Sequence, residues 1–264
     1  MRLKLFEIHD QRWFPDFLRR EVLEALQMIL ERTDAYRPIA GRLRQALDYS
    51  GAREVLDLFS GAGGPWPSLV QLFGSKGASP IEVFLTDKFP NVSNSVNTGM
   101  VCANGIHFLD DPVDATAIPE QFQGFRTIFS SFHHFNPEQA DRFLRESAEN
   151  GKGVGVFEVA SRHTFTLLSI FAMPLADWIF TPLRVPFRWS RLLWTYVIPV
   201  VPAVLLVDGL ISCLRAYSLA DLHAMTAAVH GRDYEWQIGE ESSGRLPLRV
   251  TYLVGFPRKL LAAN

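Results

Sequence analysis

The chain has 264 residues, of which 48% are hydrophobic and 20% charged, and this balance fits a globular protein with one large catalytic domain rather than a disordered chain. The formal net charge of −2 offers no basic surface, so nucleic acid is not an expected partner. Cys102 and Cys213 lack metal-ligand or disulfide spacing, and the first ten residues lack the apolar run of a signal peptide. We therefore expect a cytoplasmic protein.

Two helices are predicted before the first strand. Apolar residues recur at helical spacing over residues 16–32, and a second helix is expected from Pro38 to about Leu47, where Gly51 would end it. We expect residues 1–50 to cap the core or to close over a pocket.

A glycine-rich loop follows the first predicted strand. The segment Glu54–Pro67 reads as an apolar strand, a loop with glycines at 61, 63 and 64, and a helix that begins near the prolines. Such a loop lets a nucleotide-like ligand approach the backbone and the N-terminal N–H groups of the helix. The alternative is an ordinary connection between a strand and a helix.

Strands and helices then alternate along the chain. Apolar runs predict strands at 81–86, 106–109, 127–132 and 153–159, and helices are expected at 68–73 and from Asn136. This alternation is typical of an α/β fold with a doubly wound parallel sheet. Asp87 ends the second of these strands, beside the glycine loop if the strands are neighbours, where it could bind a ribose or simply cap a helix.

Residues 50–160 resemble the class I S-adenosylmethionine (SAM)-dependent methyltransferases. The resemblance rests on the glycine loop, on Asp87, on the Asp-Ala pair after the third strand and on the segment after the fourth. It implies a Rossmann-like, seven-stranded, mostly parallel sheet with a SAM-binding core at residues 51–160. The residues implied to bind SAM are Asp57, Ser60, Gly61 and Gly63 for the methionine part, Asp87 for the ribose, and Asp114 and Ala115 for the adenine edge. Phe59 departs from the pattern, because the family's usual residue there is glycine.

Two other families share parts of this loop. The segment 57–64 is similar to the loop of DNA cytosine-5 methyltransferases, but Cys102 follows Val101 and Cys213 follows Ser212, so the Pro-Cys nucleophile of those enzymes is missing. In a dinucleotide-binding GxGxxG motif the third glycine would fall at Trp66.

An apolar segment follows the fifth predicted strand. Its uncharged runs, 164–176 and 192–207, are 13 and 16 residues long, shorter than the ~20 residues of a membrane span. We expect residues 161–217 to form a helical apolar lid or insertion on a soluble enzyme. A peripheral membrane contact is the alternative, because arginines lie among its aromatic residues, as in interfacial helices. These arginines are Arg184, Arg188 and Arg191.

Residues 218–264 are expected to complete the sheet. Ser218 and Asp221 form a capping pattern for a last helix, and strands at 234–238 and 250–256 would pair as the antiparallel hairpin that ends the sheet in the resembled family.

Methyl transfer needs an aligned donor and, for many acceptors, a base that removes a proton. His133 and His134 follow the fourth strand and Glu158 ends the fifth, which makes them the candidate catalytic residues, with His163 next. The sequence shows no metal-ligand spacing, so metal-independent O-, N- or C-methylation of a small hydrophobic or aromatic acceptor is expected. The alternative is a membrane-peripheral or regulatory protein that binds SAM without methyl transfer.

Overall fold

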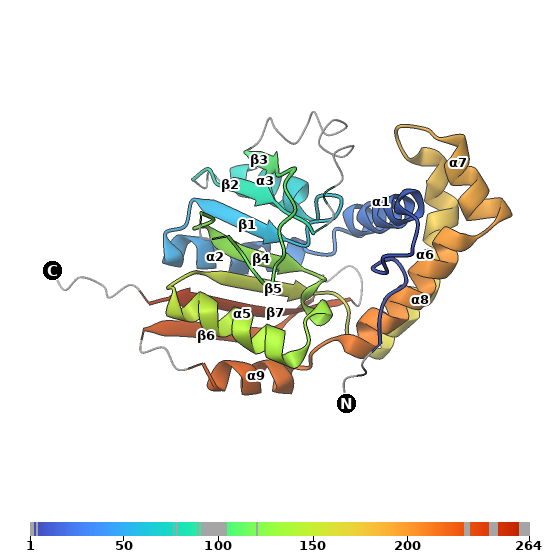
Figure 1. Ribbon diagram of the computed structural model, residues 1–264. Coiled ribbons are helices and arrows are strands. Elements are labelled where there is room, and N and C mark those ends of the chain that lie inside the picture. The colour runs from blue at the N-terminus through green and yellow to red at the C-terminus, as the bar shows by residue number, and fades with distance from the viewer. Residues whose placement is uncertain are drawn as a thin grey trace.

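The structure, a computed structural model, describes residues 3, 5–75, 77, 79–88, 90, 105–119, 121–229, 233–242 and 248–258. Cys102 lies outside these residues. The described residues form one seven-stranded sheet in the order β3-β2-β1-β4-β5-β7-β6, with helices on both faces (Figure 1). The strands are β1 (Glu54–Leu58), β2 (Glu82–Leu85), β3 (Ile106–Phe108), β4 (Phe125–Phe129), β5 (Val154–Glu158), β6 (Tyr234–Ser242) and β7 (Arg249–Pro257).

The sheet is mixed. Strands β1 to β5 pair in parallel, while β7 pairs antiparallel with both β5 and β6. The sheet is therefore mixed and not mostly parallel as expected. Both pairings of β7 are antiparallel, and the hairpin strands β6 and β7 are nine residues long each. The expected antiparallel end of the sheet is present.

Two helical layers cover the faces of the sheet. On one face, α2 (Ala40–Ser50) and α3 (Trp66–Ser75) bury residues such as Leu43 and Leu69. On the other face, α5 (Pro137–Glu149) and α9 (Leu219–Ala227) bury residues such as Phe143 and Leu222. Both α5 and α9 begin with a capping box, and that of α9 joins Ser218 to Asp221 as the sequence indicates.

Strand β4 ends earlier than predicted. The expected strand ran to Phe132, but β4 stops at Phe129, and Ser130 adopts a left-handed φ of 43°. The next residues form the 3-10 helix η3 (Phe132–His134), and the backbone N–H of Phe132 donates to Glu158 Oε1 at 2.6 Å. The chain therefore turns out of the sheet toward the end of β5.

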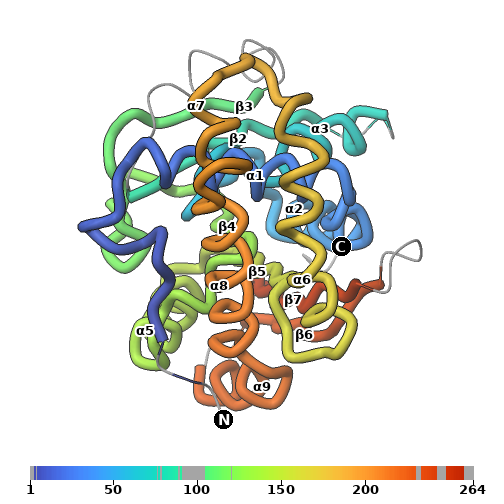
Figure 2. The backbone as a smooth tube through the Cα atoms, turned by 90° about the vertical axis from the view of Figure 1, so that its right-hand side faces the viewer, coloured from blue at the N-terminus to red at the C-terminus, as the bar shows by residue number. Residues whose placement is uncertain are grey.

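The segment between β5 and α9 is helical. It contains α6 (Thr164–Phe180), η4 (Thr181–Leu183), α7 (Trp189–Leu192), the π-helix η5 (Leu193–Val197) and α8 (Val200–Arg215). Figure 2 looks onto α6 and α8, which run side by side, and α1 (Asp16–Thr33) packs against α8 through Val22 and Leu205. These helices lie beyond the carboxyl ends of the parallel strands (Figure 1).

One expectation about this segment is wrong. The length of the first uncharged run predicts a segment too short to cross a membrane, but α6 and η4 form a helix over Thr164–Leu183 that is 20 residues long and apolar enough to do so. The helix continues through Asp177, which is fully buried, and through Pro174. Its length and composition alone do not establish a span.

Candidate active site

The glycine loop is held by a buried carboxylate. Asp57, near the end of β1, is 1% exposed and accepts hydrogen bonds from Thr127 Oγ1 at 2.6 Å and Ser60 Oγ at 2.7 Å. Burial raises the pKa of Asp57 to about 6, although its hydrogen bonds oppose this shift. The carboxylate thus ties the loop to the neighbouring strand β4.

The loop after β1 meets the end of β2. The backbone N–H of Gly61 donates to Asp87 Oδ2 at 2.9 Å, so Asp87 lies beside the loop as its place after the second strand predicts. The N–H groups of Ser60 and Gly63 also have partners within the protein, the carbonyl oxygens of Thr86 and Ser60 respectively. The backbone N–H groups of Ser60, Gly61 and Gly63, which are predicted to face a ligand, thus form hydrogen bonds within the protein that fix the shape of the loop.

Glycine is required at two positions of this loop. Gly61 and Gly63 have φ values of 53° and 120°, which side chains other than glycine rarely adopt. A Cβ on Gly63 would lie 3.5 Å from the ring of Phe108, and one on Gly61 would lie 3.8 Å from Leu23 of α1. These separations are ordinary van der Waals contacts, so it is the positive φ angles that favour glycine in this loop, which lies against Leu23 of α1 and which we call the cradle.

Asp114 and Ala115 follow β3 and lie near Asp87. The backbone N–H of Val113 donates to the Asp87 carbonyl at 2.9 Å, while Asp114 accepts from Lys88 Nζ at 2.7 Å. The Lys88 hydrogen bond lowers the pKa of Asp114 to about 2. Ala115 is buried in the core. The predicted cofactor residues thus gather along the ends of β1, β2 and β3.

His133 is enclosed by two carboxylates. Its Nδ1 lies 2.9 Å from Glu158 Oε2 and its Nε2 lies 3.1 Å from Glu7 Oε1, and the His133 side chain is 2% exposed. Burial disfavours the charged ring, but Glu158 and Glu7 outweigh burial and raise the pKa of His133 to about 10. His133 is therefore an imidazolium at neutral pH.

His134 faces the cavity more openly. Its side chain is 17% exposed, and its Nδ1 donates to Asp10 Oδ2 at 2.8 Å. Interaction with His134 lowers the pKa of Asp10 against the effect of burial, so Asp10 is ionised and the ring hydrogen lies on Nδ1. In the neutral ring the lone pair is then on Nε2, which lies 3.7 Å from Glu7 Oε2, and the ring stacks on Phe59 with centroids 6.0 Å apart.

Residues that no sequence motif indicated as functional complete this site. Glu7 is 2% exposed and lies between both histidines, and a row of polar residues on α8 supports it. Ser212 Oγ donates to Glu7 Oε1 at 2.9 Å, and Asp208 accepts from the backbone N–H of Ile8 at 2.7 Å and from His9. The signal was present as polar residues at helical spacing in an apolar run, namely Asp208, Ser212 and Arg215.

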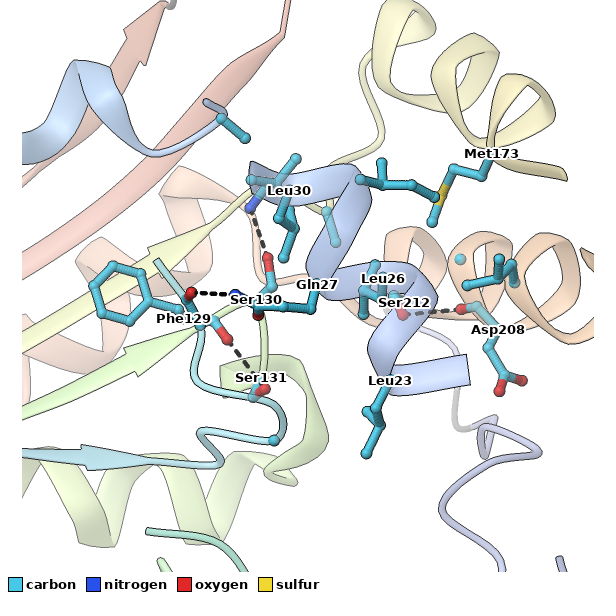
Figure 3. A pocket seen from close by; sticks show the side chains of 18 of the residues that line it. Leu23, Leu26, Gln27, Leu30, Phe129, Ser130, Ser131, Met173, Asp208 and Ser212 are labelled. Atoms are coloured by element: carbon cyan, nitrogen blue, oxygen red, sulfur yellow. Dashed lines mark hydrogen bonds between the residues drawn. The ribbon is translucent and has the colours of Figure 1, made fainter. Parts of the chain in front are cut away.

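A cavity of about 430 Å³ joins the loop to the histidines. Its wall includes Gly61 and Ser60 of the glycine loop, His133 and His134, and mainly apolar side chains of α1, α6 and α8. Figure 3 shows Leu26 and Leu30 of α1 and Met173 of α6 around this space. The predicted loop and the two predicted histidines thus share one cavity, whereas Glu158 does not line it.

Two further expectations from the sequence concern His163 as a catalytic candidate and chemistry without a metal. His163 lies outside this cavity, where its Nε2 pairs with Glu240 at 2.8 Å and its side chain is 46% exposed. Ligand atoms of Glu7, His133 and His134 lie within 4.8 Å of one another, a set that could hold a metal ion. Metal-independent chemistry therefore stays a prediction.

Comparison with solved structures identifies the fold. The chain is similar to human N-acetylserotonin methyltransferase in complex with SAM, with a TM-score of 0.53 and 13% identity over 91% of this chain and 56% of that chain. It is also similar to the mitomycin 7-O-methyltransferase MmcR, with a TM-score of 0.52 and 18% identity over 92% of this chain and 58% of that one. The O-methyltransferase NcsB1, in complex with SAM and 2-hydroxy-5-methyl naphthoic acid, matches with a TM-score of 0.50 and 13% identity over 90% and 58%.

These likenesses show a methyltransferase α/β fold. The chain spans little more than half the length of each of the three proteins. No family model matches the sequence, and no curated protein matches it in sequence.

Proposed function

We propose that the protein is a SAM-dependent methyltransferase that acts on a small hydrophobic or aromatic acceptor. The observation that carries the proposal is the meeting, in one cavity of a methyltransferase fold, of the cradle at Gly61 with His134. A protein that only bound SAM would need the cradle, but it would not need an imidazole oriented toward the same cavity.

The cofactor residues proposed are those at the ends of β1, β2 and β3. Asp87 lies where it can accept hydrogen bonds from a ribose, and the cradle at Gly61 and Gly63 leaves room for a ligand close to the backbone. When bound, SAM supplies a methyl group on a positively charged sulfur. Asp57 and Ser60 act by holding the loop in shape, since both their side chains are used within it.

His134 is the proposed base. Asp10 fixes the hydrogen on Nδ1, so Nε2 can accept a proton from a hydroxyl or amine acceptor, and Asp10 then stabilises the resulting imidazolium. His133 carries its own proton and both its ring nitrogens are engaged, so we assign it to positioning Glu7 and the η3 turn. Glu158 has the same task, because its two oxygens accept from Phe132 and His133.

The apolar cavity supports a hydrophobic acceptor. The side chains from α1 and α6 that line it offer few hydrogen-bonding groups, and NcsB1, of similar fold, was solved with an aromatic acid. We place the enzyme in the cytoplasm, and its chemistry is proposed to need no metal. Activity that survives dialysis against a chelator would support the latter point, and its loss would contradict it.

Calorimetry with SAM tests the proposed function. We expect Asp87→Ala to weaken SAM binding about tenfold to a hundredfold, since hydrogen bonds to a charged group contribute about 1.5–3 kcal/mol. Gly61→Val should weaken it as well, because valine is strained at a φ of 53°. Glu149→Ala, at the end of α5, is the control and should bind as the unaltered protein does. Absence of SAM binding, or equal affinity in Asp87→Ala, would overturn the assignment.

A further inference from the structure

The segment from α6 to α8 exposes an unusual amount of apolar surface. Most of the exposed large hydrophobic side chains of the described residues belong to it. We name as the apolar face Leu168, Phe171, Leu175 and Ile179 of α6 together with Phe187 and Trp189, which are between 52% and 78% exposed. Several exposed large apolar side chains on one helix and the segment that follows it are typical of an interaction site on a folded protein.

The buried side of the same helix belongs to the cavity. Thr166, Ile170 and Met173 line the cavity, whereas Leu168, Phe171 and Leu175 point away from it at the complementary helical positions. Only 22% of the apolar window of this helix is buried, so most of its apolar residues have exposed surface. One side of α6 is apolar because it lines the cavity, whereas the opposite side is apolar although it is exposed.

The charges of this segment are turned inward. Between Thr164 and Val207 the chain carries four charged residues, and each pairs with another charge; Asp177, Arg184 and Arg191 are buried, and Arg188 is 23% exposed. Together with two glutamates of α1 they form what we call the arginine cluster: Asp177, Arg184, Arg188, Arg191, Glu21 and Glu24. Arg184 and Arg191 are 7% and 2% exposed, so they are not placed to contact phosphate groups.

The polar ends of two aromatic residues are also satisfied inside the segment. Trp178 Nε1 donates to the carbonyl of Thr195 at 3.1 Å, and Tyr196 OH donates to the carbonyl of Trp178. Helix α6 satisfies most of its own backbone groups as well, so its exposed side can leave water with little loss of hydrogen bonds. Of the six side chains of the apolar face only Trp189 carries a hydrogen-bonding group, whereas a protein partner ordinarily meets several such groups and a polar rim.

We infer that the apolar face docks the protein on the hydrocarbon region of a lipid bilayer. The contact is peripheral: α6 lies in the interface with its exposed side in the acyl chains, and the sheet remains outside. Because the arginines are paired internally, burial of apolar area drives the contact, and attraction to anionic lipid headgroups does not.

Flotation with lipid vesicles tests the inference. The purified full chain should float with vesicles of phosphatidylcholine alone as well as with phosphatidylcholine mixed with phosphatidylglycerol, and high salt should not release it. Leu168→Lys combined with Phe171→Lys should weaken vesicle binding at least about tenfold for each residue, since full burial of each such side chain is worth about that factor. Tyr49→Lys, at a 50% exposed aromatic residue on α2, is the matched control and should float as the unaltered chain does.

A second measurement does not depend on that double variant. Brominated lipids should quench tryptophan fluorescence in the unaltered chain, and Trp189→Phe should remove part of the quenching, because Trp189 is 78% exposed on the apolar face. The inference is overturned if the chain stays with the aqueous fraction, or if it floats only with phosphatidylglycerol and at low salt. It is equally overturned if the chain forms a dimer without vesicle affinity and Leu168→Lys with Phe171→Lys makes it monomeric, because the face then binds a second copy.

Discussion

Two charged clusters in this protein are built by different elements and from different side chains. At the carboxyl edge of the sheet, Glu7 pairs with His133 and lies beside His134, and α8 supports it through Ser212. In the arginine cluster, Glu21 of α1 pairs with Arg191 between α6 and α8. Imidazoles can gain or lose a proton near neutral pH and guanidinium groups cannot. The first cluster can therefore move protons, whereas the second can only hold helices together.

Replacement of His134 should have the largest effect. We expect His134→Ala to lower turnover by a factor of about 10² to 10⁴ at saturating acceptor, with SAM affinity nearly unchanged, because the base acts on the acceptor. His163→Ala is the control, since His163 lies outside the cavity, and it should keep full turnover. Near-full turnover in both His133→Ala and His134→Ala would make the pair structural and leave catalysis to alignment alone.

Replacement of Arg191 should affect stability and leave the chemistry alone. Arg191→Met leaves Glu21, which is 2% exposed, without its 2.8 Å partner, and we expect a loss of about 3 kcal/mol in the free energy of unfolding by urea. Arg145→Met removes an exposed pair with Asp141 on α5 and should cost no more than about 0.5 kcal/mol. Equal losses in the two variants would show that burial of the arginine cluster does not matter.

The pH dependence of stability distinguishes the clusters most finely. The pKa of His133 is raised from 6.5 to about 10, so its stabilising contribution is complete below pH 6.5 and is lost as the pH rises toward 10. Within that window the free energy of unfolding should fall by about 1.4 kcal/mol per pH unit for this one proton. In His133→Gln this slope should be absent. The difference in the free energy of unfolding between the unaltered protein and the variant should therefore become smaller as the pH rises. A difference that does not change between pH 6.5 and 10 would contradict the raised pKa.

The sequence predicted the alternation of strands and helices and the meeting of Asp87 with the glycine loop, because those signals are local. The glycine loop and Asp87 each follow an apolar strand, and parallel strands bring their ends to one edge. The site around His133 was predicted only in part, because Glu7 and Ser212 reach it from positions 126 residues before and 79 after it in the chain. Likewise, nothing in the pattern near Arg191 indicated that it would be buried against Glu21, and its place among aromatic residues suggested a free cation instead.

Helix α1 contacts both the glycine loop and the arginine cluster within two turns. Gln27 Nε2 donates to the carbonyl of Gly64 at 2.7 Å, and Glu21, six residues earlier, holds Arg191. A ligand at the glycine loop that displaced α1 would therefore also act on Arg191 and the helices that carry the apolar face. Linkage then imposes reciprocity: the factor by which SAM changes the affinity for vesicles must equal the factor by which vesicles change the affinity for SAM. The two binding constants, measured separately and together, give the coupling free energy between them.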